Sequence, residues 1–154
     1  MAHLLFTRYD AIPGIYLVFL AWFVALVASL GALFVGEVMG NEPCVLCWYQ
    51  RTAMFPLALI LGTAFIANDE RVVRYALPLA CVGVAIAGWH SLVYAGIVPD
   101  EVQPCTRDGT SCSGAAMLLF DVAPLPLLSL ATFAIIAVAL ALANRKSRQE
   151  GDVA

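Results

Sequence analysis

The sequence has little charge. Only 12% of its 154 residues are Asp, Glu, Lys or Arg, whereas 62% are hydrophobic and the mean hydropathy is +0.89. A water-soluble domain carries about 25% charged residues, so this chain is expected to use lipid as its solvent. The net charge is −3 and no basic run is longer than Arg145-Lys146, which argues against a nucleic-acid-binding surface. The length leaves no room for a separate soluble domain beside several membrane spans.

Four apolar runs are long enough to cross a bilayer, which takes roughly 20 residues. They cover residues 11–35, 44–67, 75–98 and 124–143, and residues 144–154 follow as a polar tail that we expect to fray. The first run is longer than the apolar core of a signal peptide and lacks a cleavage site of the Ala-x-Ala kind, so it is interpreted as a span. The sequence therefore predicts an all-α integral membrane protein, a single bundle of four helices.

Basic residues are concentrated on one side of these spans. Six of the eight Lys and Arg residues lie before the first span, between the second and third, or after the fourth. The two loops on the other side, residues 36–43 and 99–114, contain a single basic residue, Arg107. Short loops rich in Lys and Arg stay in the cytoplasm, so both termini are predicted to be cytoplasmic.

Four of the five cysteines lie on the opposite, outer side. Cys44 and Cys47 stand at the start of the second span, and Cys105 and Cys112 lie in the second outer loop. In a bacterial cell that side is oxidising, and two disulfides near one surface can exchange through a mixed disulfide. Whether the resting bonds lie within the loops or join them is left open. Cys81, in the third span, is interpreted as a small apolar residue buried in the packing.

The Cys44-x-x-Cys47 pair is placed to react. The N–H groups of a first helical turn and the positive end of the helix dipole stabilise a thiolate, and Pro43 leaves Cys44 at or just before the first helical position. At helical spacing, Cys44, Cys47 and Arg51 are predicted to share one face. An arginine within a span costs about 2.5–3.5 kcal/mol at the helix centre, so Arg51 is a candidate functional residue. The alternative is a side chain that reaches out to the lipid headgroups.

A zinc site built from the four outer cysteines is the other chemistry that this residue set permits. The C-x-x-C half fits zinc-ribbon spacing, but the six residues between Cys105 and Cys112 do not match a zinc knuckle, and an oxidising compartment favours disulfides. No metal is therefore expected.

The motif Cys44-Val-Leu-Cys-Trp-Tyr-Gln-Arg51 resembles the signature of the disulfide bond formation protein B (DsbB) family of quinone-coupled thiol oxidases. The likeness extends over about the whole chain, through four spans, inner termini and a second cysteine pair before the fourth span. It implies an enzyme of the bacterial inner membrane, with its cysteines at the periplasmic side. Such an enzyme oxidises a periplasmic, DsbA-like thioredoxin-fold protein and passes two electrons to ubiquinone or menaquinone. The short separation of Cys105 and Cys112 is similar to that of the short-loop branch.

The resemblance also implies roles for single residues. Cys105 and Cys112 would exchange with the partner, with Cys105 as the sulfur that is attacked. Cys44 and Cys47 would form the quinone-facing pair, with Cys47 approaching the ring and Arg51 beside the quinone oxygens. Some members carry Glu at the position of Gln50, so no role is transferred to that side chain.

Polar and aromatic residues near the outer ends of the spans have two interpretations. His90 either assists proton delivery to the reduced quinone or is a neutral histidine hydrogen-bonded to a neighbouring helix. Asp121 is interpreted as a cap of the fourth helix. Four aromatic residues are interpreted mainly as interfacial anchors, some of which line a quinone pocket: Trp48, Tyr49, Trp89 and Tyr94.

Two other functions compete with the thiol oxidase. A reductase similar to vitamin K epoxide reductase also has four helices and two cysteine pairs, but its C-x-x-C lies late in the chain, whereas here it opens the second span. A structural four-span protein with static loop disulfides is the second alternative. That alternative leaves Arg51 within the membrane unexplained.

Overall fold

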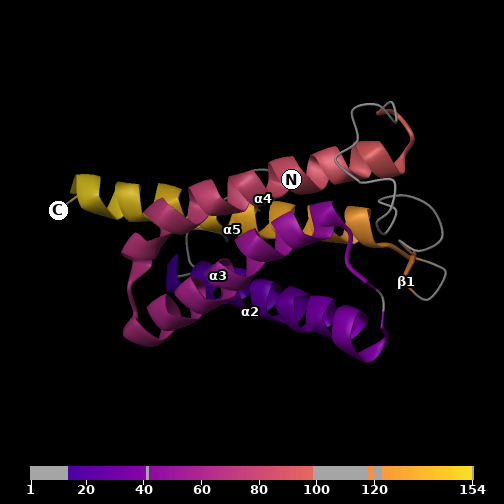
Figure 1. Cartoon of the computed structure of the whole chain (residues 1–154). Coiled ribbons are helices and arrows are strands. Elements are labelled where there is room, and N and C mark those ends of the chain that lie inside the picture. Colours follow the sequence, from indigo (N-terminus) through magenta and orange to yellow (C-terminus); the bar gives the residue numbers. More distant parts are fainter. Residues whose placement is uncertain (1–13, 41, 99–117, 120–122, 154) are drawn as a thin grey trace.

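Four long helices make up most of the protein, as seen in a computed structural model that describes residues 14–40, 42–98, 118–119 and 123–153 (Figure 1). They are α2 (Gly14–Leu33), α3 (Val45–Ala67), α4 (Val73–Tyr94) and α5 (Leu125–Val153). Each contacts two neighbours, so that α2, α3, α4 and α5 close into a ring in chain order. The predicted all-α bundle with four membrane-spanning helices is confirmed.

Short elements complete the chain at the helix ends. A π-helix, η1 (Phe34–Val38), extends α2, and a 3₁₀ turn, η2 (Glu70–Val72), leads into α4. Two-residue strands, β1 (Leu118–Leu119) and β2 (Ala123–Pro124), pair antiparallel just before α5. In Figure 1, η1, the start of α3 and β1 lie at one end of the bundle, and the C-terminal end of α5 lies at the other.

The helix boundaries follow from local capping chemistry. Cys44 is the N-cap of α3, with extended backbone angles (φ −67°, ψ 167°). Asn68 ends the same helix in the left-handed conformation (φ 52°), which asparagine tolerates better than most residues. Asp69 then accepts a hydrogen bond from the Arg71 backbone N–H (2.9 Å) and starts the turn into α4. A connection of this few residues makes α3 and α4 antiparallel neighbours.

The membrane spans differ most from the predicted ranges in the third and fourth helices, whereas the first, Gly14–Val38, lies three residues later than predicted. The third apolar segment covers Glu70–Tyr94 rather than residues 75–98, because the charged residues of its first turns join the helix although they lower the local hydropathy. The fourth helix continues to Val153, so the expectation of a frayed tail at residues 144–154 was wrong. A formed helix propagates through polar residues at little cost, since each added residue closes one more backbone hydrogen bond.

Small residues allow the helices to approach closely. Ala21, Ala25, Ala80 and Ala87 are fully buried, and they pack in one cluster with large side chains such as Phe133. Without a hydrophobic drive between helices in lipid, close backbone approach supplies the van der Waals contact that holds a membrane bundle together. The bundle is therefore held by interlocking of small and large residues.

Cys81 lies outside that packing. Its side chain is exposed on α4, so the prediction that it is a buried packing residue was wrong. The third span is apolar on all faces, and a helix without a polar face carries no sequence signal of which side meets lipid. Cys81 is a small apolar residue on the lipid-facing surface of the bundle.

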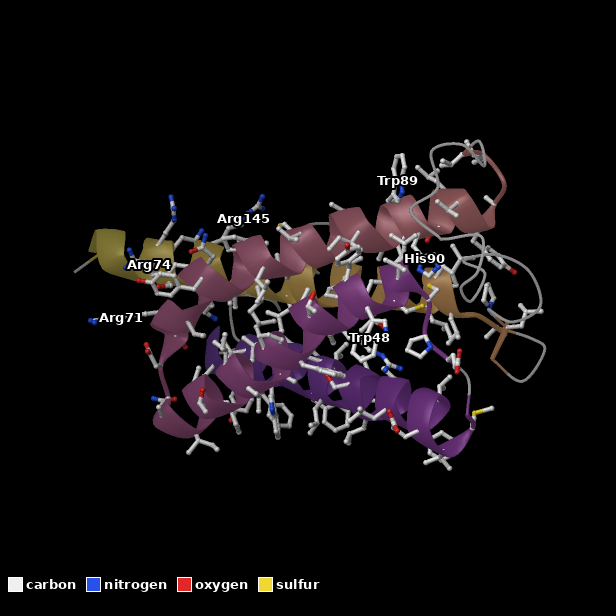
Figure 2. The ribbon with its side chains drawn as sticks, viewed as in Figure 1. Trp48, Arg71, Arg74, Trp89, His90 and Arg145 are labelled. Atoms are coloured by element: carbon white, nitrogen blue, oxygen red, sulfur yellow. The ribbon has the colours of Figure 1, made fainter. Side chains whose placement is uncertain are left out.

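The loop arginines and the tryptophans near the start of α3 lie apart along the bundle axis. Figure 2 shows Arg71 and Arg74 at the end where α3 turns into α4, whereas Trp48, Trp89 and His90 lie toward the end that carries the start of α3. This separation agrees with the asymmetry of basic residues along the sequence, from which cytoplasmic termini are predicted.

A substitution at Gly83 tests the helix packing. A Cβ at Gly83 would overlap the ring of Phe133, which is fully buried, whereas a Cβ at Gly88 on the same helix meets nothing within 4 Å. We expect Gly83→Ala to lower the free energy of unfolding by about 1–3 kcal/mol, since an overpacked core forces side chains from their rotamers. Thermal unfolding in detergent measures the effect. Gly88→Ala is the matched control, and equal melting temperatures for the two variants would contradict the packing described.

Candidate functional site

The two sulfur atoms of the C-x-x-C motif lie together at the N-terminus of α3. Cys44 Sγ and Cys47 Sγ are 2.9 Å apart, and the Cys47 backbone N–H donates to Cys44 Sγ (3.3 Å). Both are free thiols in the structure. The prediction that Cys44 stands at the helix start is confirmed, because it is the N-cap residue. Its sulfur thus occupies the position where a side-chain acceptor caps the first-turn N–H groups.

The two thiols face different surroundings. Cys44 is 2% exposed and packs with Leu46, Val93 and Val98, whereas Cys47 is half-buried and lines a cavity. Cys47 and Arg51 both line the cavity, whereas Cys44 Sγ lies beside Cys47 Sγ but does not line it. An N-cap residue has extended rather than helical backbone angles, so helical spacing does not extend to its side chain.

Arg51 is buried inside the bundle. Its guanidinium Nη2 donates to the backbone oxygen of Ala32 on α2 (2.6 Å), and its Cζ lies 5.4 Å from the centre of the Trp48 ring. A Cβ at Gly36 would lie 2.8 Å from Nη2, so the glycine gives the guanidinium room. The side chain is thus directed toward α2. The alternative interpretation, in which it reaches out to the lipid headgroups, is therefore wrong.

A local irregularity of the helix accompanies this contact. The π-helix η1 begins two residues after Ala32, and the Met39 N–H donates to the Phe34 carbonyl in the i to i+5 pattern. π-Helical turns are rare and are found frequently at functional sites. Here the irregular turn lies against the only charged side chain among those within α3.

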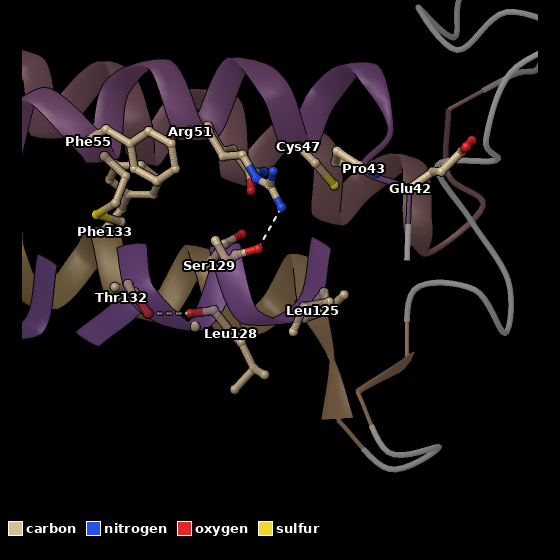
Figure 3. A pocket seen from close by; sticks show the side chains of 16 residues that line it. Glu42, Pro43, Cys47, Arg51, Phe55, Leu125, Leu128, Ser129, Thr132 and Phe133 are labelled. Atoms are coloured by element: carbon tan, nitrogen blue, oxygen red, sulfur yellow. Dashed lines mark hydrogen bonds between the residues drawn. The ribbon is translucent and has the colours of Figure 1, made fainter. Parts of the chain in front are cut away.

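A cavity of about 250 Å³ lies between α2, α3 and α5 beside these residues. In Figure 3 the Cys47 sulfur and the Arg51 guanidinium face it from α3, with Ser129 and Thr132 across from them on α5. Most of the lining is apolar. Its members are Ala28, Gly31, Ala32, Val35, Glu42, Pro43, Cys47, Gln50, Arg51, Met54, Phe55, Leu125, Leu128, Ser129, Thr132 and Phe133. An apolar cavity with few convergent polar groups is the usual form of a small-molecule site.

His90 lies on the other side of the thiol pair, within α4. It is 1% exposed, and its Nε2 lies 3.8 Å from Cys44 Sγ while its Nδ1 lies 3.0 Å from Gln50 Nε2. His90 does not appear in the lining of the cavity formed by the described residues. Its hydrogen bond to Gln50 on α3 matches the second interpretation, a histidine bonded to a neighbouring helix. The ring connects Gln50, which lines the cavity, to Cys44, which does not.

The electrostatics of the pair favour a thiolate at Cys44, which directly precedes the spanning residues Val45–Ala67. The pKa of the Cys44 thiol is lowered to about 5, chiefly because the Cys47 thiol donates a hydrogen bond to its sulfur. Burial raises this pKa, and the His90 side chain lowers it. A hydrogen bond to the charged form stabilises that form. Reduced Cys44 therefore carries the nucleophilic sulfur of the pair at neutral pH.

The other predicted residues divide into two groups. Cys105, Cys112 and Asp121 lie outside the described residues. Three of the four outer aromatic residues are largely exposed, as interfacial anchors would be, and Tyr94 is half-buried; none of the four is in the cavity lining described above.

Sequence reasoning missed the contributions of α2 and α5 to the cavity. Ser129 and Thr132 are three residues apart, so they project from neighbouring positions of α5, and this polar pair in an apolar span was the available signal. Ala28 and Ala32 carry no comparable signal, because their contribution is small size and, for Ala32, a backbone oxygen.

Comparison with known proteins agrees with this geometry. The sequence profile of the family described as disulfide bond formation protein DsbB matches residues 15–144. The chain belongs to the DsbB family. It is therefore a multi-pass membrane protein with a role in disulfide bond formation, as the resemblance of its C-x-x-C motif indicated.

Named relatives share most of their length with this chain. A probable disulfide formation protein of Metapseudomonas resinovorans is 55% identical over 131 residues, which cover 85% of this chain and 91% of the relative. Disulfide bond formation protein C of Bacillus subtilis (strain 168) is 39% identical over 128 residues, covering 83% and 92%. A probable disulfide formation protein of Deinococcus radiodurans is 37% identical over 126 residues, covering 77% and 82%. No solved structure matches the chain.

The thiol pair is tested by titration. In reduced protein with Cys81, Cys105 and Cys112 changed to Ser, we expect one thiolate to form with a titration midpoint of about pH 5. The ultraviolet absorbance of the thiolate measures this titration. Cys47→Ala removes the hydrogen-bond donor and is expected to raise the midpoint by about one unit or more. Cys47→Ser keeps a donor and is the matched control. An unchanged midpoint in Cys47→Ala would contradict the assigned hydrogen bond.

Proposed function

We propose that this protein is a quinone-dependent thiol oxidase that reoxidises a DsbA-like thioredoxin-fold dithiol protein. The observation that carries the proposal is the cavity between α2, α3 and α5, which one sulfur of the C-x-x-C pair and a buried guanidinium enter together. A reactive sulfur and a fixed cation beside an apolar cavity are what a two-electron transfer to a lipid-soluble acceptor requires.

The fit of the cavity to a quinone rests on Arg51. Among the described residues no carboxylate pairs with this guanidinium, and its one hydrogen bond there goes to a backbone oxygen. A buried cation without a counter-ion is expensive unless it serves an anionic or strongly polar group. Reduced quinone oxygens are such groups. Arg51 would hold the ring oxygens, and Cys47 would lie against the ring.

Electrons balance over two thiol–disulfide steps. The partner dithiol is oxidised as the Cys105–Cys112 disulfide is reduced through a mixed disulfide, and that dithiol then reduces the Cys44–Cys47 disulfide in the same way. A ubiquinone or menaquinone held beside Cys47 and Arg51 would supply the acceptor for two electrons and two protons, so that the Cys44–Cys47 disulfide would be restored. The chain itself supplies the sulfurs, the cation and a cavity lined mostly by apolar side chains.

The two thiols suit different parts of this exchange. Cys44 has the lowered pKa and lies away from the cavity beside His90, which suits it to attack and leave in exchange with the loop pair. Cys47 lines the cavity, and its sulfur lies within hydrogen-bond distance of Cys44 Sγ. Once Cys44 is engaged in a disulfide with the loop, that hydrogen bond is lost, and Arg51 stabilises the charge that develops on Cys47.

The site of action follows from the distribution of charge. Arg71 and Arg74 lie at the end of the bundle opposite the C-x-x-C motif, and basic ends face the cytoplasm. The thiols then face the periplasm from the bacterial inner membrane. This orientation brings the loop cysteines to the compartment where a soluble dithiol partner is present and where oxidation is maintained.

The decisive experiment is quinone reduction by purified protein with a reduced thioredoxin-fold partner. We expect Cys47→Ser to abolish turnover and Arg51→Ala to lower kcat/KM for quinone by about 10- to 100-fold, the value of one charge-assisted hydrogen bond. Cys81→Ser, which changes an exposed thiol, is the control that should retain activity. Full quinone reduction by Cys47→Ser would exclude the mechanism. A static structural disulfide protein would show no turnover in any form.

The cavity is tested separately by a steric block. Ala28 lines it, and Ala28→Phe is expected to raise the KM for quinone severalfold while thiol exchange with the partner, followed in the absence of quinone, stays unchanged. Val27→Phe adds bulk at the neighbouring position, which is 54% exposed on the outer face of α2, and serves as the matched control. Equal KM values for the two variants would place the quinone outside this cavity.

A further inference from the structure

Three ligand atoms of the kind that thiophilic metals prefer converge at the N-terminus of α3. Cys44 Sγ, Cys47 Sγ and His90 Nε2 all lie within 4.8 Å of one another. Cys44 and His90 are almost fully buried, and Cys47 is half-buried on the cavity. Figure 2 shows His90 directed from α4 toward the start of α3. Two thiols and one imidazole are also the protein ligands of several open zinc sites.

The distances suit a tetrahedral ion after a small adjustment. Zinc bonds of about 2.3 Å to sulfur and about 2.0–2.1 Å to nitrogen place two tetrahedral ligands about 3.8 Å apart for two sulfurs and about 3.6 Å for sulfur and nitrogen. Cys44 Sγ and His90 Nε2 are already 3.8 Å apart. The sulfur–sulfur distance of 2.9 Å must open by just under an ångström, and Cys47 Sγ, which lies within 4.8 Å of His90 Nε2, must reach about 3.6 Å from it.

The surrounding hydrogen bonds already orient these ligands. The Cys47 backbone N–H donates to Cys44 Sγ, an interaction that stabilises a metal-bound thiolate as it does a free one. His90 Nδ1 contacts the Gln50 amide at 3.0 Å, which leaves Nε2 to face Cys44. A metal-bound histidine needs an acceptor for its other N–H, and the Gln50 amide supplies its oxygen when it turns over.

We propose that the reduced Cys44–Cys47 pair and His90 form a binding site for a thiophilic divalent cation such as Zn²⁺, and that the bound ion blocks oxidation of the pair. Both sulfurs bind as thiolates, so that any proton still held by the pair is released to solvent, and their two negative charges neutralise the charge of the ion. The neutral His90 ring binds through Nε2, and water takes the fourth position. Because disulfide formation consumes both sulfurs, the site exists only in the reduced protein.

The surroundings of the site both give an ion access from the cavity and stabilise it once it is bound. The half-buried Cys47 leaves the site open to the cavity, at whose rim Glu42 stands. A neutral complex of one divalent cation and two thiolates avoids the cost of a buried net charge. Arg51 lies on the cavity side of Cys47 and repels a free cation there, which favours the position between the sulfurs and His90.

Metal binding can be measured without quinone or partner, so its outcome is independent of the proposed oxidase function. The measurement uses the chain with Cys105→Ser and Cys112→Ser, because these substitutions remove the loop thiols as competing zinc ligands. We expect the reduced protein to take one Zn²⁺ from a chromophoric chelator, and the oxidised protein to bind at least tenfold more weakly. Co²⁺ in place of zinc should give sulfur-to-metal charge-transfer bands. Equal zinc binding by reduced and oxidised protein would overturn the proposal.

Matched variants separate this site from general thiol binding. Cys44→Ser and His90→Phe should each weaken zinc binding at least tenfold, whereas Cys81→Ser should leave it unchanged. Gln50→Leu removes the acceptor for His90 Nδ1–H and should weaken binding about 10- to 100-fold, while Gln50→Glu retains an acceptor and should preserve it. If His90→Phe does not fold, the Co²⁺ spectrum of folded Gln50→Leu provides the test of His90 in its place. Unchanged affinity in both His90→Phe and Gln50→Leu would exclude His90 as a ligand.

In the wild-type enzyme, zinc should inhibit turnover reversibly, with full recovery on addition of a chelator. Preincubation of the reduced protein with zinc should inhibit, and preincubation of the oxidised protein should not. Inhibition that does not depend on the redox state at preincubation would contradict a site built from the reduced pair.

Discussion

The burial of one guanidinium in an apolar helix bundle is the constraint on which the rest of the site depends. Within the membrane an arginine must find its partners inside the protein, because lipid offers none. Arg51 finds the Ala32 backbone oxygen on α2 and the face of the Trp48 ring. Gly36 leaves space for it, and α2 departs from α-helical geometry next to the contact. The cavity between α2, α3 and α5 lies around this side chain.

The start of α3 places the two cysteines in different surroundings. Because Cys44 is an N-cap with extended backbone, its sulfur turns toward His90 and the α4 side, while Cys47, inside the first turn, lines the cavity with Arg51. The two sulfurs lie 2.9 Å apart, and of the two only Cys47 lines the cavity. A relay between a soluble dithiol and a lipid-soluble acceptor needs such a difference in surroundings, since its two exchange partners arrive from different solvents.

Much of the architecture was predictable because hydropathy and helix length are nearly sufficient in lipid. The four spans and the helix start at Cys44 were predicted correctly, and the family resemblance of the motif up to Arg51 is confirmed. Two predictions were wrong for related reasons. Cys81 faces outward because a uniformly apolar helix does not reveal its buried side, and residues 144–153 stay helical because a helix propagates into polar sequence.

The sequence by itself determined that the chain is a membrane protein, how many times it crosses the membrane, and that a C-x-x-C pair and an arginine stand at the start of the second span, because each of these is a local property of composition or spacing. Only the tertiary structure decided that Arg51 turns inward to α2, that α5 supplies Ser129 and Thr132 to the same cavity, and that His90 lies beside Cys44. These facts depend on the rotation of each helix about its axis. In lipid that rotation is decided by the packing of small against large residues, as of Gly83 against Phe133, and an all-round apolar sequence does not encode it locally.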